Sequence, residues 1–429
     1  MPGRTRAAVV LCVLVFLVSA GQASGATTTI PFAPTGSMAT ARGGTVAAAL
    51  PDGRVLVAGG DNAGGFVASA DIFNPLTGSF SPSASMKTAR FGAAAAPLPG
   101  GVLVAGGYNG ADLATAEVFN AATGSFSPVS AMASARSDPA AAPLPGGRVL
   151  VAGGENASGV LRSAVVYSPA AGFTPVAPMA IRRDAPAAAP LPDGRVLIAG
   201  GFNGSGGGTF LSSAEVYDPA TNSFSPTGSM GTARIGASAA ALPDGRVLVV
   251  GGSPDDNSAF ASAEIFDPAT NSFSSAGIGS MGTAREGPGA APLPDGRVLV
   301  AGGQDRNSVF SSAETFATPD TFTAKLKGRK LIVSVLSAGT VQVAGAITAK
   351  ELSLGAGVAK RHKRKRLLRP SHASGGPGKF RLKLKLTGAA NRALRQKGKL
   401  RVAATITFSP DAGFARTEAE RLKVKTKRR

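Results

Sequence analysis

Six arginines recur in this chain of 429 residues, and each stands a few residues before an apolar run. Their guanidinium groups could bind carboxylate, sulfate or phosphate through paired hydrogen bonds. A second repeated set consists of asparagines that follow the apolar runs, and side-chain amides can bind sugar hydroxyls. The candidate ligand-binding residues are therefore Arg42, Arg90, Arg136, Arg182, Arg234, Arg285, Asn62, Asn109, Asn156, Asn203, Asn257 and Asn307. In the fourth copy Arg183 could take the place of Arg182.

The residue types on which many enzymes depend are scarce in this chain. It has two histidines, one cysteine and no tryptophan, and both His362 and His372 lie far from the arginines. These counts exclude a disulfide framework, and they argue against a Cys/His zinc site or a Ser-His-Asp triad among the repeats. We expect no catalytic residue, no metal and no cofactor. An enzyme acting on polysaccharide, a hydrolase or lyase with acids in the loops 253–257 and 304–307, is the alternative.

Short strands must position these side chains. Six apolar runs such as RVLVAGG end in a Gly-Gly pair, and the pairs are 47 to 51 residues apart. Pro-Asp-Gly or Pro-Gly-Gly precedes five of the runs, which predicts a tight hairpin turn of type I′. One further strand precedes each hairpin and two follow it, as at 236–242, 213–218 and 223–226. Four short antiparallel strands in a period of about 50 residues predict one blade of a β-propeller.

The repeat resembles the kelch motif. The resemblance rests on the Gly-Gly pair, on a downstream Glu-Val-Tyr-Asp such as 215–218, and on an aromatic residue near the fourth strand. That aromatic, usually tryptophan in the family, is here Phe80, Phe126, Phe173, Phe224 and Phe273. The resemblance covers residues 27–318 and implies an all-β fold, but membership alone implies no activity.

The two ends of the repeat region predict the number of blades. The sixth repeat has no fourth strand of its own, whereas residues 27–38 (TTTIPFAPTGSM) match the fourth strand at 222–230 (NSFSPTGSM). We therefore expect a six-bladed propeller in which the N-terminal segment completes the last blade. This closure leaves no exposed sheet edge.

The kelch resemblance also suggests a role for the arginines. It implies that they lie near the mouth of the central channel, on the face that carries the loops after Gly-Gly. In kelch-family ubiquitin-ligase adaptors, arginines at this position bind acidic peptides. The alternative is an internal ion pair with an acid on the third strand of the blade, and both interpretations stay open because the third repeat has Val165 there. The acids in question are Asp71, Glu117, Glu215, Glu264 and Glu314. The recurring methionines are expected to pack between blades; they are Met38, Met86, Met132, Met179, Met230 and Met281.

Galactose oxidase, whose central domain is also a kelch propeller, offers a second resemblance. Its copper site requires two histidines, two tyrosines and a cysteine cross-link. The repeats contain neither histidine nor cysteine, so copper-radical oxidation is excluded on ligand chemistry.

Charge separates the last quarter of the chain from the repeats. Residues 26–319 contain 15 basic and 20 acidic residues, whereas residues 320–429 contain 28 basic and 5 acidic ones. Alternating segments at 321–327, 330–337, 339–347, 380–386, 400–408 and 415–426 predict a small β-sandwich-like domain, with a short helix at 388–397. We expect a flexible basic loop near 360–378. Its candidate contacts to an anionic cell-surface polymer are Lys360, Arg361, Lys363, Arg364, Lys365 and Arg366. Nucleic acid is not expected because aromatic residues are not interleaved with these charges.

The first 26 residues have the pattern of a secretory signal peptide. Arg4 and Arg6 precede an apolar run of 12 residues, too short to span a bilayer, and cleavage could follow Ala20, Ala23 or Ala26. We therefore expect three parts: a signal peptide (1–26), a six-bladed propeller (27–318) and a basic β domain (319–429). The predicted function is that of a secreted, monomeric, non-enzymatic binding or adhesion protein. It would recognise a glycan or an acidic protein ligand, have no transmembrane span after cleavage, and be held at an anionic cell surface by its basic domain. A purely structural surface repeat protein is a further alternative.

Overall fold

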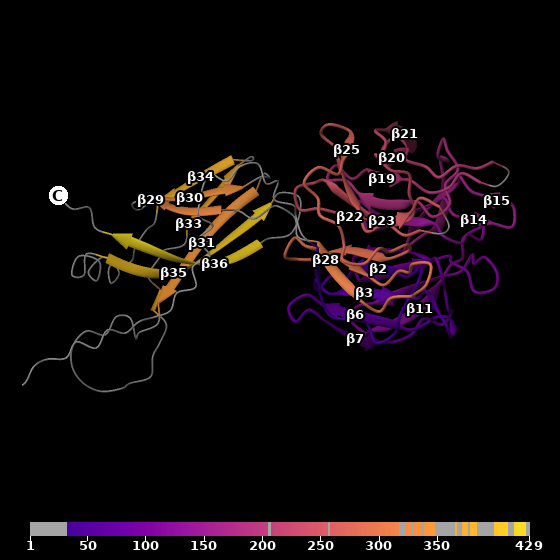
Figure 1. The fold of residues 1–429 in the computed structure, drawn as a ribbon, viewed down its shortest axis with the longest axis horizontal. Coiled ribbons are helices and arrows are strands. Elements are labelled where there is room, and N and C mark those ends of the chain that lie inside the picture. The colour runs from indigo at the N-terminus through magenta and orange to yellow at the C-terminus, as the bar shows by residue number, and fades with distance from the viewer. Residues whose placement is uncertain are drawn as a thin grey trace, which may run out of the picture.

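The computed structural model contains six four-stranded antiparallel sheets arranged around an axis (Figure 1). It describes residues 32–204, 207–255 and 258–316, and beyond these the eight strands between Thr323 and Lys425. Every regular element in this part of the chain is a strand. The expected signal peptide and the expected helix at 388–397 lie outside the described residues. Within them, no helix is long and apolar enough to cross a membrane.

Each blade follows the chain from the innermost to the outermost strand, except the last. The first three blades are β2 (Val46–Ala49), β3 (Val55–Ala58), β6 (Ala70–Asn74) and β7 (Ser79–Ser83); β8 (Ala94–Leu98), β9 (Gly101–Ala105), β10 (Ala116–Asn120) and β11 (Ser125–Val129); and β12 (Ala140–Leu144), β13 (Arg148–Ala152), β16 (Ala164–Ser168) and β17 (Gly172–Val176). The other three are β18 (Ala187–Pro190), β19 (Val196–Ala199), β20 (Ala214–Asp218) and β21 (Ser223–Thr227); β22 (Ile235–Ala241), β23 (Val247–Ser253), β24 (Ala263–Asp267) and β25 (Ser272–Ser274); and β26 (Gly289–Pro292), β27 (Val298–Ala301), β28 (Ala313–Phe316) and β1 (Phe32–Pro34). Two small hairpins project from the loops: β4 (Asp61–Asn62) with β5 (Gly65–Phe66), and β14 (Glu155–Asn156) with β15 (Gly159–Val160).

The N-terminal strand closes the ring, as the sequence predicts. β1 pairs antiparallel with β28, and Phe32 stands opposite Phe316. The two rings lie 5.0 Å apart between centroids and repeat the aromatic pair found on the outer strands of the other blades, such as Phe73 with Phe80 at 4.9 Å. The sixth blade is therefore built from the two ends of the propeller.

Burial explains the composition of the strands. The apolar residues of the second strand of each blade are buried, and Val55 and Val57 on β3 have no exposed surface. Alanine is the commonest residue of the innermost strands because six of them converge on one axis, where small side chains fit. The recurring methionines are all buried, which confirms their packing role: Met38, Met86, Met132, Met179, Met230 and Met281.

The Pro-Asp-Gly hairpin turns differ from the prediction, whereas both glycines of Pro145-Gly146-Gly147 have positive φ, at 78° and 71°. A type I′ turn needs positive φ at both central residues, but in Pro51-Asp52-Gly53 only the glycine has one, at 85°. The loop is one residue longer: the Leu50 amide donates to the Arg54 carbonyl, and the Gly53 amide donates to Leu50. The aspartate instead accepts from the Arg54 backbone amide (3.0 Å) and from Arg54 Nε (2.7 Å).

Backbone hydrogen bonds join the blades around the channel mouth. One residue with positive φ begins each inner segment, and its amide donates to the carbonyl of the equivalent residue in the preceding blade; Thr45 makes the final link, to Gly287. The six residues are Gly44, Gly92, Asp138, Ala185, Gly236 and Gly287. Asp138 (φ 51°) and Ala185 (φ 45°) adopt a conformation that ordinarily favours glycine. Below this ring the inner strands enclose a narrow channel of about 130 Å³.

The C-terminal strands form two sheets. One has the order β29 (Thr323–Lys327), β30 (Lys330–Val335), β34 (Gly378–Lys383). The other has the order β32 (Lys365–Arg366), β31 (Gly339–Ile347), β35 (Lys399–Pro410), β36 (Arg416–Lys425), with β33 (Ser371–Gly375) also paired to β31. The expected loop near 360–378 is thus partly wrong, because β32, β33 and the start of β34 fall within it and pair with neighbouring strands. The packing of the two sheets as a sandwich stays a prediction.

Candidate ligand-binding face

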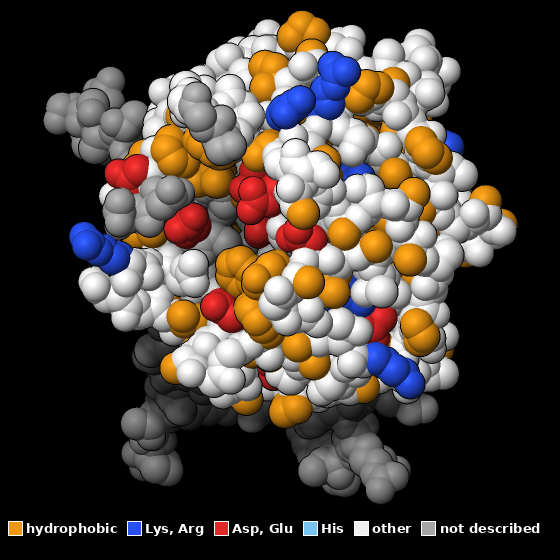
Figure 2. All heavy atoms as spheres, turned by 90° about the vertical axis from the view of Figure 1, so that its right-hand side faces the viewer, with side chains coloured by type: hydrophobic (Ala, Val, Ile, Leu, Met, Phe, Trp, Pro, Cys, Tyr) orange, Lys and Arg blue, Asp and Glu red, His pale blue; other side chains and the backbone are white. Residues whose placement is uncertain are grey.

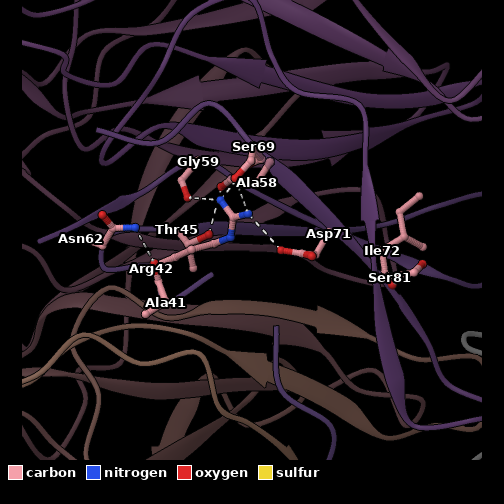
Figure 3. A network of polar contacts seen from close by, with 10 residues as sticks. All are labelled: Ala41, Arg42, Thr45, Ala58, Gly59, Asn62, Ser69, Asp71, Ile72 and Ser81. Atoms are coloured by element: carbon pink, nitrogen blue, oxygen red, sulfur yellow. Dashed lines mark hydrogen bonds and ion pairs between the residues drawn. The ribbon is translucent and has the colours of Figure 1, made fainter. Parts of the chain in front are cut away.

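The repeated arginines lie inside the propeller. Arg42, which is 1% exposed, shows the pattern (Figure 3). Its Nη1 donates to the carbonyls of Gly59 (3.1 Å) and Ser69 (2.7 Å), and its Nη2 donates to Ser69 Oγ (2.8 Å) and Asp71 Oδ2 (2.9 Å). The guanidinium thus ties together the end of the second strand and the start of the third. Nothing of it is available to a ligand outside the fold.

The same arrangement recurs in every blade. The buried arginines are Arg42, Arg90, Arg136, Arg183, Arg234 and Arg285, each at most 1% exposed. Five of them pair with the acid on the third strand of their blade at 2.9–3.3 Å. In the fourth blade the residue is Arg183, whereas Arg182 is exposed. The prediction that the six arginines bind an anionic ligand is therefore wrong, and the alternative of an internal ion pair is confirmed.

The third-strand glutamates hold the backbone as well as the arginine. In the second blade, Glu117 accepts hydrogen bonds from the backbone amides of Lys87 (2.8 Å) and Thr88 (3.1 Å) in the segment that enters the blade. Glu215, Glu264 and Glu314 do the same in their blades. One carboxylate therefore fixes the path by which the chain passes from one blade to the next.

The third blade lacks this carboxylate. Val165 occupies the position, and Arg136 is held only by the carbonyls of Gly153 (2.9 Å) and Ser163 (3.1 Å) and by Ser163 Oγ (3.2 Å). Burial lowers the pKa of Arg136 to about 10. These contacts join the end of the second strand to the start of the third without a carboxylate.

Acidic side chains gather at the centre of the loop-bearing face, while the prominent basic side chains lie nearer its edge (Figure 2). The acids come from two positions of the repeat: the residue or two after each arginine, and the residue after each Gly-Gly. Backbone bridges such as Ser137 with Glu155 and Glu286 with Gln304 hold the two positions together. The acids of this mouth are Asp61, Asp138, Glu155, Asp184 and Glu286. The face is therefore suited to neutral or cationic groups rather than to anions.

Two of these carboxyls have strongly raised pKa values. Burial, together with the charges of Glu155, Glu286 and Asp112, raises the pKa of Asp138 to about 7. Burial, with the charges of Asp138, Glu155 and Asp112, raises the pKa of Asp184 to about 8. No cation contributes to either shift. Both groups therefore carry protons at a pH at which an ordinary aspartate has lost its own.

These pKa values predict a stability that falls as the pH rises. Between about pH 4 and pH 8 the folded chain holds protons that the unfolded chain has released, so the free energy of unfolding decreases with pH. Asp184→Asn removes one such proton site, so the variant should lose less stability than the unchanged chain when the pH rises from 5 to 9. We expect the two losses in the free energy of unfolding to differ by about 2 kcal/mol. Urea unfolding followed by circular dichroism at both pH values measures this difference. Asp112→Asn is the control, since it removes only a neighbouring charge; equal shifts in the two variants would contradict the assignment.

A cleft of about 730 Å³ opens on the same face, between the loops of the last and first blades. Most of the residues that line it carry polar side chains, among them Glu286 and Arg306. The lining includes Asn62, Gln304, Asp305, Asn307 and Ser308. A mixture of amides, hydroxyls and both signs of charge suits a ligand that offers many hydroxyl groups.

The predicted asparagines fall into two groups. Asn62, Asn156 and Asn203 accept backbone amide hydrogen bonds that shape their own loops, although Asn62 also lines the cleft. Asn109 and Asn307 are exposed, and Asn307 lies in the cleft. Asn257 lies outside the described residues. The cleft thus brings together two of the six asparagines.

The sequence analysis missed Asp138, Asp184 and Glu286. Its search followed positions that all repeats share, and those positions hold the fold together. The residue after each arginine varies from blade to blade: Gly43, Phe91, Ser137, Asp184, Ile235 and Glu286. Variation within an otherwise regular repeat is the sequence feature that could have indicated the exposed mouth.

Comparison with known families agrees with the architecture. A kelch-motif profile matches residues 42–87, 89–133 and 185–231, and a second kelch-motif profile matches residues 234–278. Each match extends from a buried arginine, or a residue near one, into the outer strands of a blade. The domain is a kelch propeller. Its six blades and their closure by β1 accord with the prediction from the repeats.

Two solved structures share the fold of this kelch propeller. One, titled "Structure of YjhT", has a TM-score of 0.57 and 12% identity, and the alignment covers 66% of this chain and 97% of the other. The second, a fungal alcohol oxidase of the AA5 family in complex with copper, has a TM-score of 0.54 and 16% identity, with 93% and 100% covered. No curated protein matches the chain significantly.

The residues of this kelch propeller do not fit a copper centre like that of the oxidase. Neither histidine nor cysteine occurs between residues 32 and 316. Within the described residues no three His, Cys, Asp or Glu side chains converge as metal ligands. The likeness to the oxidase therefore concerns the fold.

Proposed function

We propose that the chain is a non-enzymatic kelch binding protein that recognises a glycan in the cleft between its last and first blades. The cleft carries this proposal, because its volume and polar lining suit a sugar-sized ligand. The adjoining acids favour a neutral or amino-bearing glycan over a carboxylated one, because like charges repel. An acidic protein ligand loses its support, since the arginines that would bind it are buried.

Binding of the full-length chain to immobilised oligosaccharides tests the proposal. The array holds neutral, amino-bearing and carboxylate-bearing glycans, and we expect the binding that depends on the cleft to be confined to the first two classes. Arg306→Ala combined with Asn307→Ala removes two side chains from the cleft and should weaken binding at least tenfold. The matched control combines Arg182→Ala with Asn109→Ala, which removes the same residue types at exposed positions outside the cleft. Equal affinity of the two double variants, or binding to carboxylated glycans alone, would refute the proposal.

A polysaccharide-active enzyme is the second candidate, supported by one observation. Carboxyl groups with pKa values near neutrality are typical of general acids, and Asp138 and Asp184 have values of about 7 and 8 at the channel mouth. Release of reducing ends from the bound glycan, lost in Asp184→Asn, would favour the enzyme. Retention of intact glycan favours the binding protein.

A further inference from the structure

The C-terminal strands alternate basic and apolar residues, and their pairing registers determine which residues share a face. In the three-stranded sheet, Lys330 on β30 stands opposite Lys327 on β29 and Lys383 on β34. The next row places Ile332 between Lys325 and Arg381. Since alternate positions of a strand share one face, these basic residues occupy a single face of the sheet. The opposite face takes the apolar positions Ala324, Leu326, Leu331, Val333, Phe380 and Leu382.

The five-stranded sheet repeats this arrangement. Lys399 stands opposite Lys425, and Arg401 stands opposite Lys423, at one end of β35 and β36. The next row runs through Arg366, Ala346, Ala403 and Arg421 across four strands. The intervening positions pair Leu400 with Val424 and Val402 with Leu422. Each sheet therefore has one basic face, and we call the two together the basic rows. The basic rows comprise Lys325, Lys327, Lys330, Lys379, Arg381, Lys383, Arg366, Lys399, Arg401, Arg421, Lys423 and Lys425.

The registers set like charges directly against each other. Four cross-strand pairs join two cations: Lys327 with Lys330, Lys330 with Lys383, Lys399 with Lys425, and Arg401 with Lys423. Such pairs destabilise a sheet. The acids of β36, Glu418 and Glu420, occupy positions on the other face of the sheet. Among the described strands, then, the basic rows have no acid at their own positions, and an anion from outside the chain would relieve their repulsion.

We propose that the basic rows bind a linear anionic polysaccharide, and that the segment 360–364, which lies outside the described residues, is not the main contact. Positions two apart on a strand are about 6.6 Å apart, and neighbouring strands are about 4.8 Å apart. Within each sheet, the rows thus space basic positions at regular intervals along which an extended polymer can lie. Eight of the twelve residues are lysines, which act as point charges and impose little geometry.

Two other classes of polyanion fit less well. Binding of single-stranded nucleic acid relies on aromatic side chains on which bases stack, whereas Phe380 and Phe408 occupy positions on the faces opposite the basic rows. Insertion into a lipid surface adds buried apolar residues to the charge attraction, and on the basic rows Ile332 is the one large apolar residue. Charge without stacking or insertion favours a polymer that carries neither bases nor acyl chains.

The test compares two variants of the full-length chain that lose the same charge. The sheet variant carries Lys330→Gln, Lys383→Gln, Arg401→Gln and Lys423→Gln; the loop variant carries Lys360→Gln, Arg361→Gln, Lys363→Gln and Arg364→Gln. Binding to dextran sulfate and to polygalacturonate is measured at 50 and 200 mM salt. The sheet variant should bind at least tenfold more weakly than the unchanged chain, and the loop variant less than threefold. Raising the salt should weaken binding of the unchanged chain by at least about tenfold.

Stability distinguishes a lost contact from a damaged fold. Because the sheet variant removes like-charge pairs, its thermal midpoint in low salt without polymer should equal or exceed that of the unchanged chain. If the sheet variant melts at a lower temperature than the unchanged chain, the single variant Lys330→Glu is tested in its place. It should also lose binding. Equal losses in the sheet and loop variants, or a loss confined to the loop variant, overturn the proposal. Tighter binding to single-stranded DNA or to phosphatidylglycerol vesicles than to either polysaccharide also overturns it. The cleft variants of Arg306 and Asn307 should leave polysaccharide binding by the rows intact.

Discussion

Replacing Arg234 with methionine should lower the free energy of unfolding of the propeller by about 3–5 kcal/mol, because removing one partner of a buried ion pair leaves the other charge unpaired. The stranded group is Glu264, which is buried with Arg234 at 3.3 Å. Three further hydrogen-bond acceptors would also lose their donor: the Gly251 carbonyl (2.9 Å), the Ser262 carbonyl (3.1 Å) and Ser262 Oγ (2.9 Å). Urea unfolding of the full-length chain measures the loss.

Two other arginines provide the comparison. Arg136→Met removes a guanidinium of equal burial but strands no carboxylate, since Val165 replaces the acid. It should therefore cost about 1–2 kcal/mol, the value of its carbonyl contacts. Arg182→Ala lies on the exposed surface and should change stability by less than about 0.5 kcal/mol. If Arg136→Met and Arg234→Met lower the free energy of unfolding equally, the third-strand carboxylates do not contribute to stability as we describe.

Replacing Phe32 with alanine should open the ring, with a loss of about 2–4 kcal/mol from the removed aromatic pair and the strand that it anchors. β1 spans three residues and joins the sixth blade through Phe32, Ala33 and Pro34. Without the Phe32 side chain against Phe316, this strand keeps little apolar contact with the sixth blade. Hydrogen exchange of the Ala313–Phe316 amides should then approach that of an edge strand.

Phe80→Ala is the matched control. Phe80 pairs with Phe73 at 4.9 Å, much as Phe32 pairs with Phe316 at 5.0 Å. Its strand, β7, is joined to β6 by a short turn, so the strand stays in place after the side chain is removed. This variant should lose stability and keep the protection of β6. Equal loss of protection in both blades would show that chain connectivity does not matter here.

Much of the fold follows from the sequence because its causes repeat. Gly-Gly, the buried valine runs and the paired aromatics each serve a local need that recurs six times, so one blade explains the others. Closure also followed from the sequence, since residues 27–38 carry the pattern that the last repeat lacks. The turn type was wrong because Asp52 binds its own loop, a contact that the Asp-Gly pair alone does not reveal.

The candidate site was less predictable because residues that repeat in every blade serve the fold. An arginine in every repeat looks equally suited to a ligand and to the fold, and burial decides between them. The acids that reach the surface, Asp138, Asp184 and Glu286, belong to no repeated motif. Their proximity depends on the ring of blades, which brings together residues more than 100 positions apart in the chain. In the C-terminal strands the alternation was visible, but the pairing of lysine with lysine needed the registers.

The closing strand also determines when the propeller can complete its folding. Phe32 emerges from the ribosome early, whereas Phe316, its partner in the last blade, follows 284 residues later. During that interval each new blade can pack on the one before, but the two outermost blades have no neighbour on one side. Because contacts of high sequence separation form slowly, joining β1 to β28 should be the last and slowest step of folding. Until it occurs, the free edge of β28 is a place where another copy of β1 could bind, so refolding at high protein concentration should yield strand-exchanged chains.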